Sequence, residues 1–295
     1  MMGYIYIIIA VLFNAAKGYS SKRVSGSLCT LRENLSFNAV RLFTTGLFAL
    51  IFVLLRGIHD VFSPDSAELI ICAVAGIAMS VFTCVWQMAI RSKAYMLVSA
   101  CSSASFIVPV ICGLLLWNES FTLPGIGAFI LIILAMYFLL LYDFKMNGKI
   151  SIREAILLIL VLVSQGVMSC TQKLYAIYAT DKDSGIYTLY MFVFAFCVSL
   201  LLLAFFKEGN SKKVGSVMHG NIVYMLIMSA SLFATSFFQA LAAKSVDAVI
   251  LYPILSGLSL AAGSSMSALF FKEKLTRNSL IGITLVFCAL VLSRF

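Results

Sequence analysis

Polar side chains that could hold a small solute lie inside the long apolar stretches of this 295-residue chain. Arg41 stands about five residues into one stretch, and no Asp or Glu lies inside any stretch to neutralise it. An anionic substrate group is a suitable partner, because a guanidinium binds carboxylates and phosphates with two parallel hydrogen bonds. The alternative is that Arg41 reaches back to the membrane interface or bonds a backbone carbonyl.

A Thr and a Gln four positions apart occur together twice. Thr83 and Gln87 form the first pair, and Thr235 and Gln239 form the second, 152 residues later. A spacing of four puts the members of each pair on one helical face. The pattern predicts either substrate contacts or hydrogen bonds between helices, because an amide buried in hydrocarbon needs a partner.

A second polar pattern follows one face of a predicted helix near the C-terminus. Tyr252, Ser256 and Ser259 recur at helical spacing beside Pro253, which removes one backbone donor. Serines in membrane helices commonly serve packing, but this combination favours a cavity wall. Trp86 lies well inside a stretch, where the interfacial aromatic belt does not explain it. The residues predicted to line a substrate cavity are Asn14, Arg41, Thr83, Trp86, Gln87, Ser99, Ser103, Gln165, Tyr190, Thr235, Gln239, Tyr252 and Ser256.

The residue pattern offers nothing for catalysis or metal binding. His59 and His219 fall in predicted loops without a second ligand at metal spacing, and the eight cysteines form no Cys-x-x-Cys pair. A membrane enzyme usually clusters His, Asp or Glu at the membrane face, and this chain has no such cluster. We predict no catalytic residue, no metal and no cofactor.

Transmembrane helices must position the polar residues. The chain is 62% hydrophobic and 11% charged, with a mean hydropathy of +1.05, whereas soluble domains are roughly 45–50% apolar and about 25% charged. About 20 apolar residues cross the hydrocarbon layer. The sequence therefore predicts an all-α integral membrane protein with ten transmembrane helices, at 2–21, 37–56, 68–90, 95–117, 123–142, 153–176, 185–206, 221–243, 246–271 and 277–294.

The net charge of +9 is explained by membrane topology. Of the 21 Lys and Arg residues, 16 fall on the side that faces the first link between helices. The positive-inside rule makes that side cytoplasmic and puts both termini outside. No nucleic-acid partner is predicted, because the basic residues never interleave with aromatics in one patch. Lys17, Lys22 and Lys173 lie near helix ends, where we expect them to extend to the interface.

A four-residue pattern indicates that the chain is one module written twice. Glu119-Ser-Phe-Thr122 recurs as Glu273-Lys-Leu-Thr276, 154 residues later. We expect Glu119, Thr122, Glu273 and Thr276 to hold a turn between helices or to form a gate.

The two modules are predicted at 1–143 and 150–295, with five helices each. An odd number of helices inverts the second module relative to the first, and inverted repeats are recurrent in secondary transporters. Weaker matches pair Asn14 with Gln165.

These features resemble the drug/metabolite transporter superfamily, in particular its EamA-type members. The resemblance is carried by the two sets of five stretches, by Arg41, and by the Glu-x-apolar-Thr link before a Gly-bearing final helix, at 119–127 and 273–282. It covers essentially the whole chain and implies a fold and a transport role. The chain departs from the repeat in its prolines: Pro109 lies ten residues before its Glu and Pro253 twenty. The resemblance also implies cytoplasmic termini, opposite to the charge distribution.

The expected function is secondary transport by alternating access across a bacterial plasma membrane. The expected substrates are small polar metabolites, such as amino acids or related anionic or zwitterionic compounds, moved in the direction of export. The expected partners are that substrate and the lipid bilayer, with the protein a monomer or homodimer. A carrier or flippase of a lipid-linked or amphiphilic molecule is the alternative, and an integral membrane enzyme is disfavoured by the missing cluster of catalytic residues.

Overall fold

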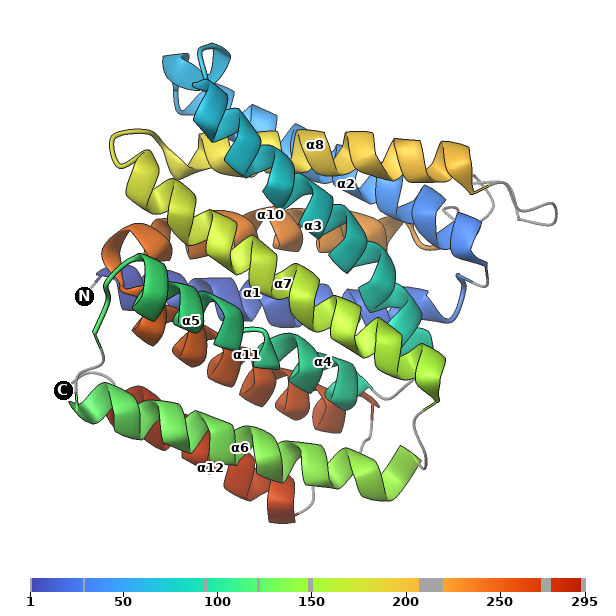
Figure 1. Cartoon of the computed structure of the whole chain (residues 1–295). Coiled ribbons are helices and arrows are strands. Elements are labelled where there is room, and N and C mark those ends of the chain that lie inside the picture. The colour runs from blue at the N-terminus through green and yellow to red at the C-terminus, as the bar shows by residue number, and fades with distance from the viewer. Residues whose placement is uncertain are drawn as a thin grey trace.

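The structure is a computed structural model that describes residues 2–28, 30–92, 95–120, 123–147, 151–206, 220–271 and 277–292. All regular secondary structure within these ranges is helical (Figure 1). The helices are α1 (Met2–Ser25), α2 (Leu31–Leu55), the short 3-10 helix η1 (His59–Phe62), α3 (Ser66–Ser92), α4 (Tyr95–Ala104), α5 (Ile107–Leu116), α6 (Leu123–Asn147), α7 (Ile152–Tyr178), α8 (Ser184–Phe205), α10 (Ile222–Ser245), α11 (Ala248–Phe271) and α12 (Arg277–Leu292).

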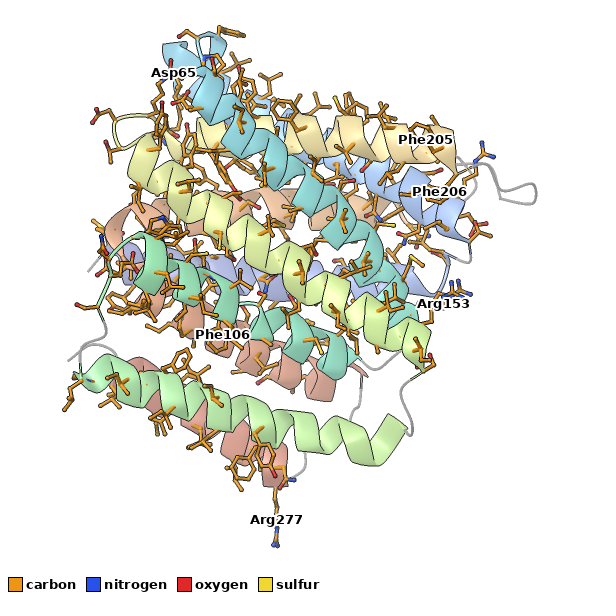
Figure 2. All side chains as sticks on the ribbon, viewed as in Figure 1. Asp65, Phe106, Arg153, Phe205, Phe206 and Arg277 are labelled. Atoms are coloured by element: carbon orange, nitrogen blue, oxygen red, sulfur yellow. The ribbon has the colours of Figure 1, made fainter. Side chains whose placement is uncertain are left out.

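Six of these helices are long and apolar enough to cross a membrane, namely α1, α2, α3, α7, α8 and α10. Shorter apolar segments occur at Cys101–Leu116, Leu123–Ala135, Ala248–Gly263 and Leu280–Ala289. Large apolar side chains cover the outside of the bundle, and the charged Asp65 and Arg153 lie at its opposite ends (Figure 2). The prediction of an all-helical, multi-pass membrane protein is confirmed at this level.

Capping residues decide where two of the long helices begin. The Thr30 side chain accepts a hydrogen bond from the Glu33 backbone amide, and the Glu33 carboxylate accepts one from the Thr30 amide. Ser151 and Glu154 form the same reciprocal capping box before α7. Each box satisfies two backbone donors that a helix start leaves unpaired. The second helix therefore begins at Leu31, six residues before the predicted boundary, which followed hydropathy alone.

The fourth predicted span is two helices, α4 and α5, with a break at Ser105 and Phe106. Both of these backbone amides donate to carbonyls three residues earlier, at 3.2 and 3.3 Å. Pro109 has no amide to donate, and its ring clashes with the carbonyl four residues before it, which belongs to Ser105. The proline therefore accounts for the break. Pro253, in contrast, lies inside a continuous α11.

The helices pack in pairs that place distant segments side by side. Figure 1 shows α6 and α12 together at one edge of the bundle, and α2 and α8 together at the opposite edge. Between these edges α1 packs on α10, α3 packs on α7 and α8, and α11 packs on α4 and α5. A Cβ on Gly76 of α3 would lie 2.5 Å from the Phe194 Cβ of α8, so only glycine permits this close contact.

Candidate functional site

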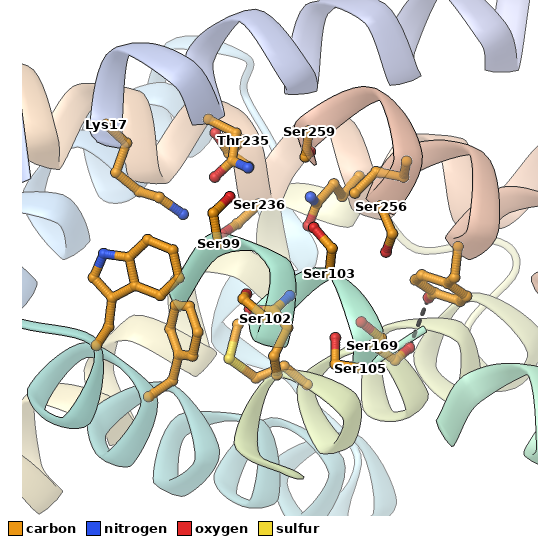
Figure 3. A pocket seen from close by; sticks show the side chains of 18 of the residues that line it. Lys17, Ser99, Ser102, Ser103, Ser105, Ser169, Thr235, Ser236, Ser256 and Ser259 are labelled. Atoms are coloured by element: carbon orange, nitrogen blue, oxygen red, sulfur yellow. Dashed lines mark hydrogen bonds between the residues drawn. The ribbon is translucent and has the colours of Figure 1, made fainter. Parts of the chain in front are cut away.

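A polar space, here called the central cavity, lies in the middle of the bundle among α1, α3, α4, α7, α10 and α11 (Figure 3). Its volume is about 60 Å³, which is enough to hold water. Hydroxyl and amide side chains predominate in its wall, which also includes aromatic rings and one cation, Lys17. A wall of this composition can bind a small polar solute through many hydrogen bonds.

Nine of the residues predicted from the sequence meet at this cavity, although they come from six different helices. Their convergence is produced by the packing of α1 on α10 and of α11 on α4. The nine are Asn14, Trp86, Ser99, Ser103, Gln165, Thr235, Gln239, Tyr252 and Ser256.

Thr83 and Gln87 lie outside the cavity wall, although they repeat the pattern of Thr235 and Gln239, which lie in it. The Thr83 hydroxyl donates to the Ser80 carbonyl of its own helix, at 3.1 Å. The face of α3 that carries this pair is therefore turned away from the cavity, while the corresponding face of α10 is turned toward it.

Tyr190 and Arg41 also lie outside the cavity wall. The Tyr190 hydroxyl donates to the Val61 carbonyl at 2.7 Å, near one end of the bundle. Arg41 is only 2% exposed, and its Nε has no hydrogen-bond partner among the described residues. The Arg41 side chain is therefore enclosed by protein and does not reach solvent.

Lys17 also lines the central cavity, although it is not among the predicted cavity residues. Figure 3 shows its side chain extending from α1 into the cavity, toward Ser99. The ammonium nitrogen lies 5.8 Å from the centroid of the Phe82 ring. The expectation that Lys17 reaches the interface is wrong. The sequence did contain a signal for this position: Lys17 follows Asn14, a predicted cavity residue, by three residues, which puts both on one helical face.

Further serines, which are not among the thirteen residues predicted to line the cavity, complete the wall. Ser102, Ser105, Ser169 and Ser236 line the cavity, as does Ser259, whose hydroxyl oxygen has no hydrogen-bond partner among the described residues. Two of them could have been found from the sequence. Ser102 lies in the serine-rich stretch from which Ser99 and Ser103 were chosen, and Ser259 belongs to the stripe that includes Tyr252 and Ser256.

One end of the cavity is bordered by a buried ion pair between Glu119 and Lys173. The Lys173 Nζ lies 3.3 Å from the Glu119 Oε1, and the two side chains are 8% and 9% exposed. The Glu119 Oε2 accepts from the Val249 amide at the start of α11, at 3.1 Å. Lys173 also donates to the Val246 carbonyl at 2.9 Å. Lys173 is therefore held by groups in the links that follow α5 and α10.

The ion pair lies about one helical turn beyond the cavity wall, because Lys173 follows Ser169 by four residues and Val249 precedes Tyr252 by three. The Tyr252 hydroxyl donates to the Ser169 carbonyl at 2.6 Å, the hydrogen bond that Figure 3 draws as a dashed line. Glu119 thus connects the turn after α5 to α7 and α11. Thr122, Glu273 and Thr276, predicted with it as turn or gate residues, lie outside the described residues.

Toward the other end of the bundle a larger space, here called the vestibule, has a volume of about 700 Å³. Three side chains stand between it and the central cavity. The Trp86 Nε1 donates to the Ser21 hydroxyl at 3.2 Å, and that hydroxyl donates to the Gln87 Oε1 at 3.1 Å. Trp86 faces the cavity and Gln87 faces the vestibule. The vestibule is lined by Leu28, Thr30, Leu31, Asn34, Gln87, Met88, Arg91, Ser151, Arg153, Glu154 and Leu157.

No protein-family model and no curated protein sequence matches this chain. A solved structure described as "Crystal structure of protein" has a similar fold, with a TM-score of 0.75. The match covers 98% of this chain and 95% of the other, at 9% sequence identity. Within the described residues no group of three His, Cys, Asp or Glu side chains is arranged to hold a metal ion. The similarity concerns the fold alone, so the function must be argued from the cavity.

Proposed function

We propose that this protein is a secondary transporter that moves small polar metabolites across a plasma membrane by alternating access. The observation that carries the proposal is a polar cavity inside a bundle with an apolar outer surface. Hydroxyl and amide groups at membrane depth cost free energy unless water, protein or a solute satisfies them. A solute site near the middle of the bundle, lined by both halves of the chain, is the arrangement that alternating access requires.

The proposal includes ten transmembrane helices in two inverted modules, with α4 and α5 counted as one broken span. Helix pairing supports it. Exchanging the modules 1–143 and 150–295 converts the contact of α1 with α10 into that of α7 with α3, and both are close contacts. The same exchange leaves three contacts unchanged, because it only swaps their two members: α2 with α8, α6 with α12, and α11 with the broken helix of α4 and α5. Two similar modules related by a twofold axis would produce this pattern.

Membership of the drug/metabolite transporter superfamily, with its EamA-type members as the nearest resemblance, is part of this proposal. The support is the ten apolar stretches and the repeated Glu-x-apolar-Thr link. In this interpretation Glu119 bridges the modules, because it belongs to the first and bonds Lys173 and Val249 of the second.

Two barriers would control access to the cavity. The ion pair of Glu119 and Lys173 would close one end, and the hydrogen-bonded row of Trp86, Ser21 and Gln87 would close the other. A cavity of about 60 Å³ is much smaller than the roughly 300–1,000 Å³ of typical ligand pockets. This conformation is therefore a narrow one, and loading a substrate requires one barrier to open.

Counterflow in proteoliposomes tests the proposal. Vesicles containing the purified full-length chain are preloaded with one solute from a panel of amino acids, organic acids and sugars, and uptake of the labelled solute is measured. We expect saturable, protein-dependent exchange of at least one solute. Gln239→Leu, which replaces a cavity amide, should slow it at least tenfold, because the substrate loses a hydrogen-bond partner. Absence of exchange for every soluble solute would overturn the proposal.

An amphiphile carrier is the second candidate, and a lateral groove favours it. This open, apolar groove of about 370 Å³ lies between α1 and α11 and includes Ala15, Ala16 and Ala262. Ala15 and Ala16 stand between the cavity residues Asn14 and Lys17, so groove and cavity share the wall formed by α1. Scrambling of a fluorescent lipid in the same vesicles, without solute exchange, would favour this candidate.

A further inference from the structure

Two cations lie inside the apolar helices of this protein, and among the described residues no carboxylate is paired with either of them. Lys17 lines the central cavity, and Arg41 is buried in α2. The charged side chain that interacts electrostatically with Lys17 is Arg41, a second cation. Among the described residues neither the Lys17 ammonium nor the Arg41 guanidinium has a hydrogen bond or ion pair, and Lys17 only faces the Phe82 ring, 5.8 Å from its centroid.

The acidic side chains of the described residues lie elsewhere in the molecule. None of them lines the central cavity. Five of them bind at helix ends, in the ion pairs Glu119–Lys173, Glu68–Lys182 and Asp183–Arg56 and in the capping boxes of Glu33 and Glu154. The cavity therefore has an excess of positive charge at membrane depth, which costs free energy until an anion compensates it.

The chemistry of the wall restricts what that anion can be. Serine and threonine hydroxyls and three amides supply donors and acceptors for the neutral part of a solute. The ammonium group of an amine or of a zwitterionic amino acid would meet the Lys17 cation and, among the described residues, no carboxylate. One cation, Lys17, can touch the solute, so a single negative charge is matched.

We propose that the central cavity binds a small organic monoanion, with the Lys17 ammonium contacting its carboxylate and the surrounding hydroxyls contacting its hydroxyl or carbonyl groups. The inference rests on the proposed transport function and narrows its substrate class from polar metabolites to net-anionic ones. Arg41 contributes positive potential from α2 without contacting the solute. Ser99 and Ser103 of α4, which face Lys17 across the cavity (Figure 3), are placed to hold the remainder of the anion.

Matched solutes of one carbon skeleton test this inference by binding. Lactate, lactamide, alanine and 1-amino-2-propanol are titrated into the purified chain in low-chloride buffer, and binding is measured by calorimetry and by the shift in unfolding temperature. A second set with an aromatic ring uses mandelate and mandelamide. In at least one set we expect the anion to bind roughly tenfold or more tightly than its amide, because a charge-assisted hydrogen bond replaces a neutral one. Alanine and the amine should bind no better than lactamide.

Variants then assign the preference to one side chain. Lys17→Met should abolish the preference for the anion, and Lys17→Arg should keep it. Lys22→Met is the matched control, because Lys22 lies on the same helix and lines none of the three spaces described above. If Lys17→Met fails to fold, the comparison of anion with amide in the native chain and in Lys17→Arg still decides the question.

The outcomes separate this inference from the function on which it rests. Equal binding of anion and amide, no binding of either set, or an anion preference that survives in Lys17→Met would overturn the anion site. Counterflow of neutral solutes without preference for anions would do so while leaving the transporter intact. Lipid scrambling without flux of any soluble solute would overturn the proposed function itself.

Discussion

At the residue scale, Glu119 and Lys173 form a buried ion pair, and its contribution to the free energy of unfolding can be compared with that of an exposed ion pair. Removing one member of a buried pair leaves an uncompensated charge, which costs about 3–5 kcal/mol. We predict that Lys173→Met lowers the free energy of unfolding by that amount, measured by denaturant titration in detergent. The double variant Glu119→Gln/Lys173→Met should recover part of the loss, because no charge is then left unpaired.

The matched control is Arg56→Met, since Arg56 pairs with Asp183 at 2.9 Å in a setting where the arginine side chain is 48% exposed. An exposed pair contributes about 0–1 kcal/mol, so this variant should lose little stability. Similar losses in Lys173→Met and Arg56→Met would show that the pair of Glu119 and Lys173 does not hold the helices together.

Single residues also show what the sequence could and could not predict about the site. Polar residues within apolar stretches, such as Asn14, Gln165 and Ser99, identify cavity positions because hydrocarbon leaves them few other partners. The pattern cannot tell which face of a helix is turned inward. Gln87 and Gln239 have the same local sequence pattern, yet only Gln239 lines the cavity. Lys17 was missed because the prediction considered how near it lies to a helix end and not which helical face it occupies.

At the element scale, two cysteines offer a natural test of motion between the modules. The Cys112 Sγ of α5 lies 3.4 Å from the Cys170 Sγ of α7, and both residues are partly buried. We predict that oxidation with a mild copper catalyst joins α5 to α7 and reduces solute exchange in proteoliposomes at least fivefold. Alternating access requires the two modules to move relative to each other, and a covalent bond across them opposes that motion.

Cys112→Ser is the control for this experiment, because it removes the bond while leaving every other cysteine to react. A reducing agent should restore exchange in the native chain. If exchange is unaffected although mass spectrometry detects the disulfide, α5 and α7 move as one body and the modules do not separate at this contact.

Element boundaries were predictable only in part. Hydropathy identifies the long stretches well, because apolar length is what a membrane selects. Hydropathy does not predict the Thr30 cap, which starts α2 before its predicted boundary, or the break between α4 and α5. Pro109 is the local cause of the break. Whether a proline divides a helix depends on how the backbone of the four preceding residues is hydrogen-bonded, and the sequence alone does not reveal this.

At the scale of the whole molecule, the proposed inversion of the second module predicts on which face of the membrane each turn lies. The turns that follow Glu119 and Glu273 occupy equivalent positions in the two proposed modules, so inversion puts them on opposite faces of the membrane. Single cysteines at Thr122 and Thr276, in a background without other reactive cysteines, should be labelled by an impermeant maleimide from opposite sides of sealed vesicles.

The same labelling also decides which face is cytoplasmic. The start of α1 and the end of α12 lie at the same end of the bundle (Figure 1), and a cysteine at Met2 reports their side. The charge distribution puts this end outside, whereas the family resemblance puts it inside. Labelling of Thr122 and Thr276 from one and the same side would contradict the inverted modules, whichever face the termini occupy.

The interruption between α4 and α5 has a consequence for how the molecule can work. Serines of α4 line the central cavity, whereas the Glu119 carboxylate, which accepts a hydrogen bond from the backbone amide at the start of α11, follows α5. Because the amides of Ser105 and Phe106 bond in the tighter 3-10 manner and Pro109 contributes none, this point is a hinge at which few helical bonds must break. In the proposed transport cycle, α5 would move relative to α4 while the serines of α4 stay in the cavity wall.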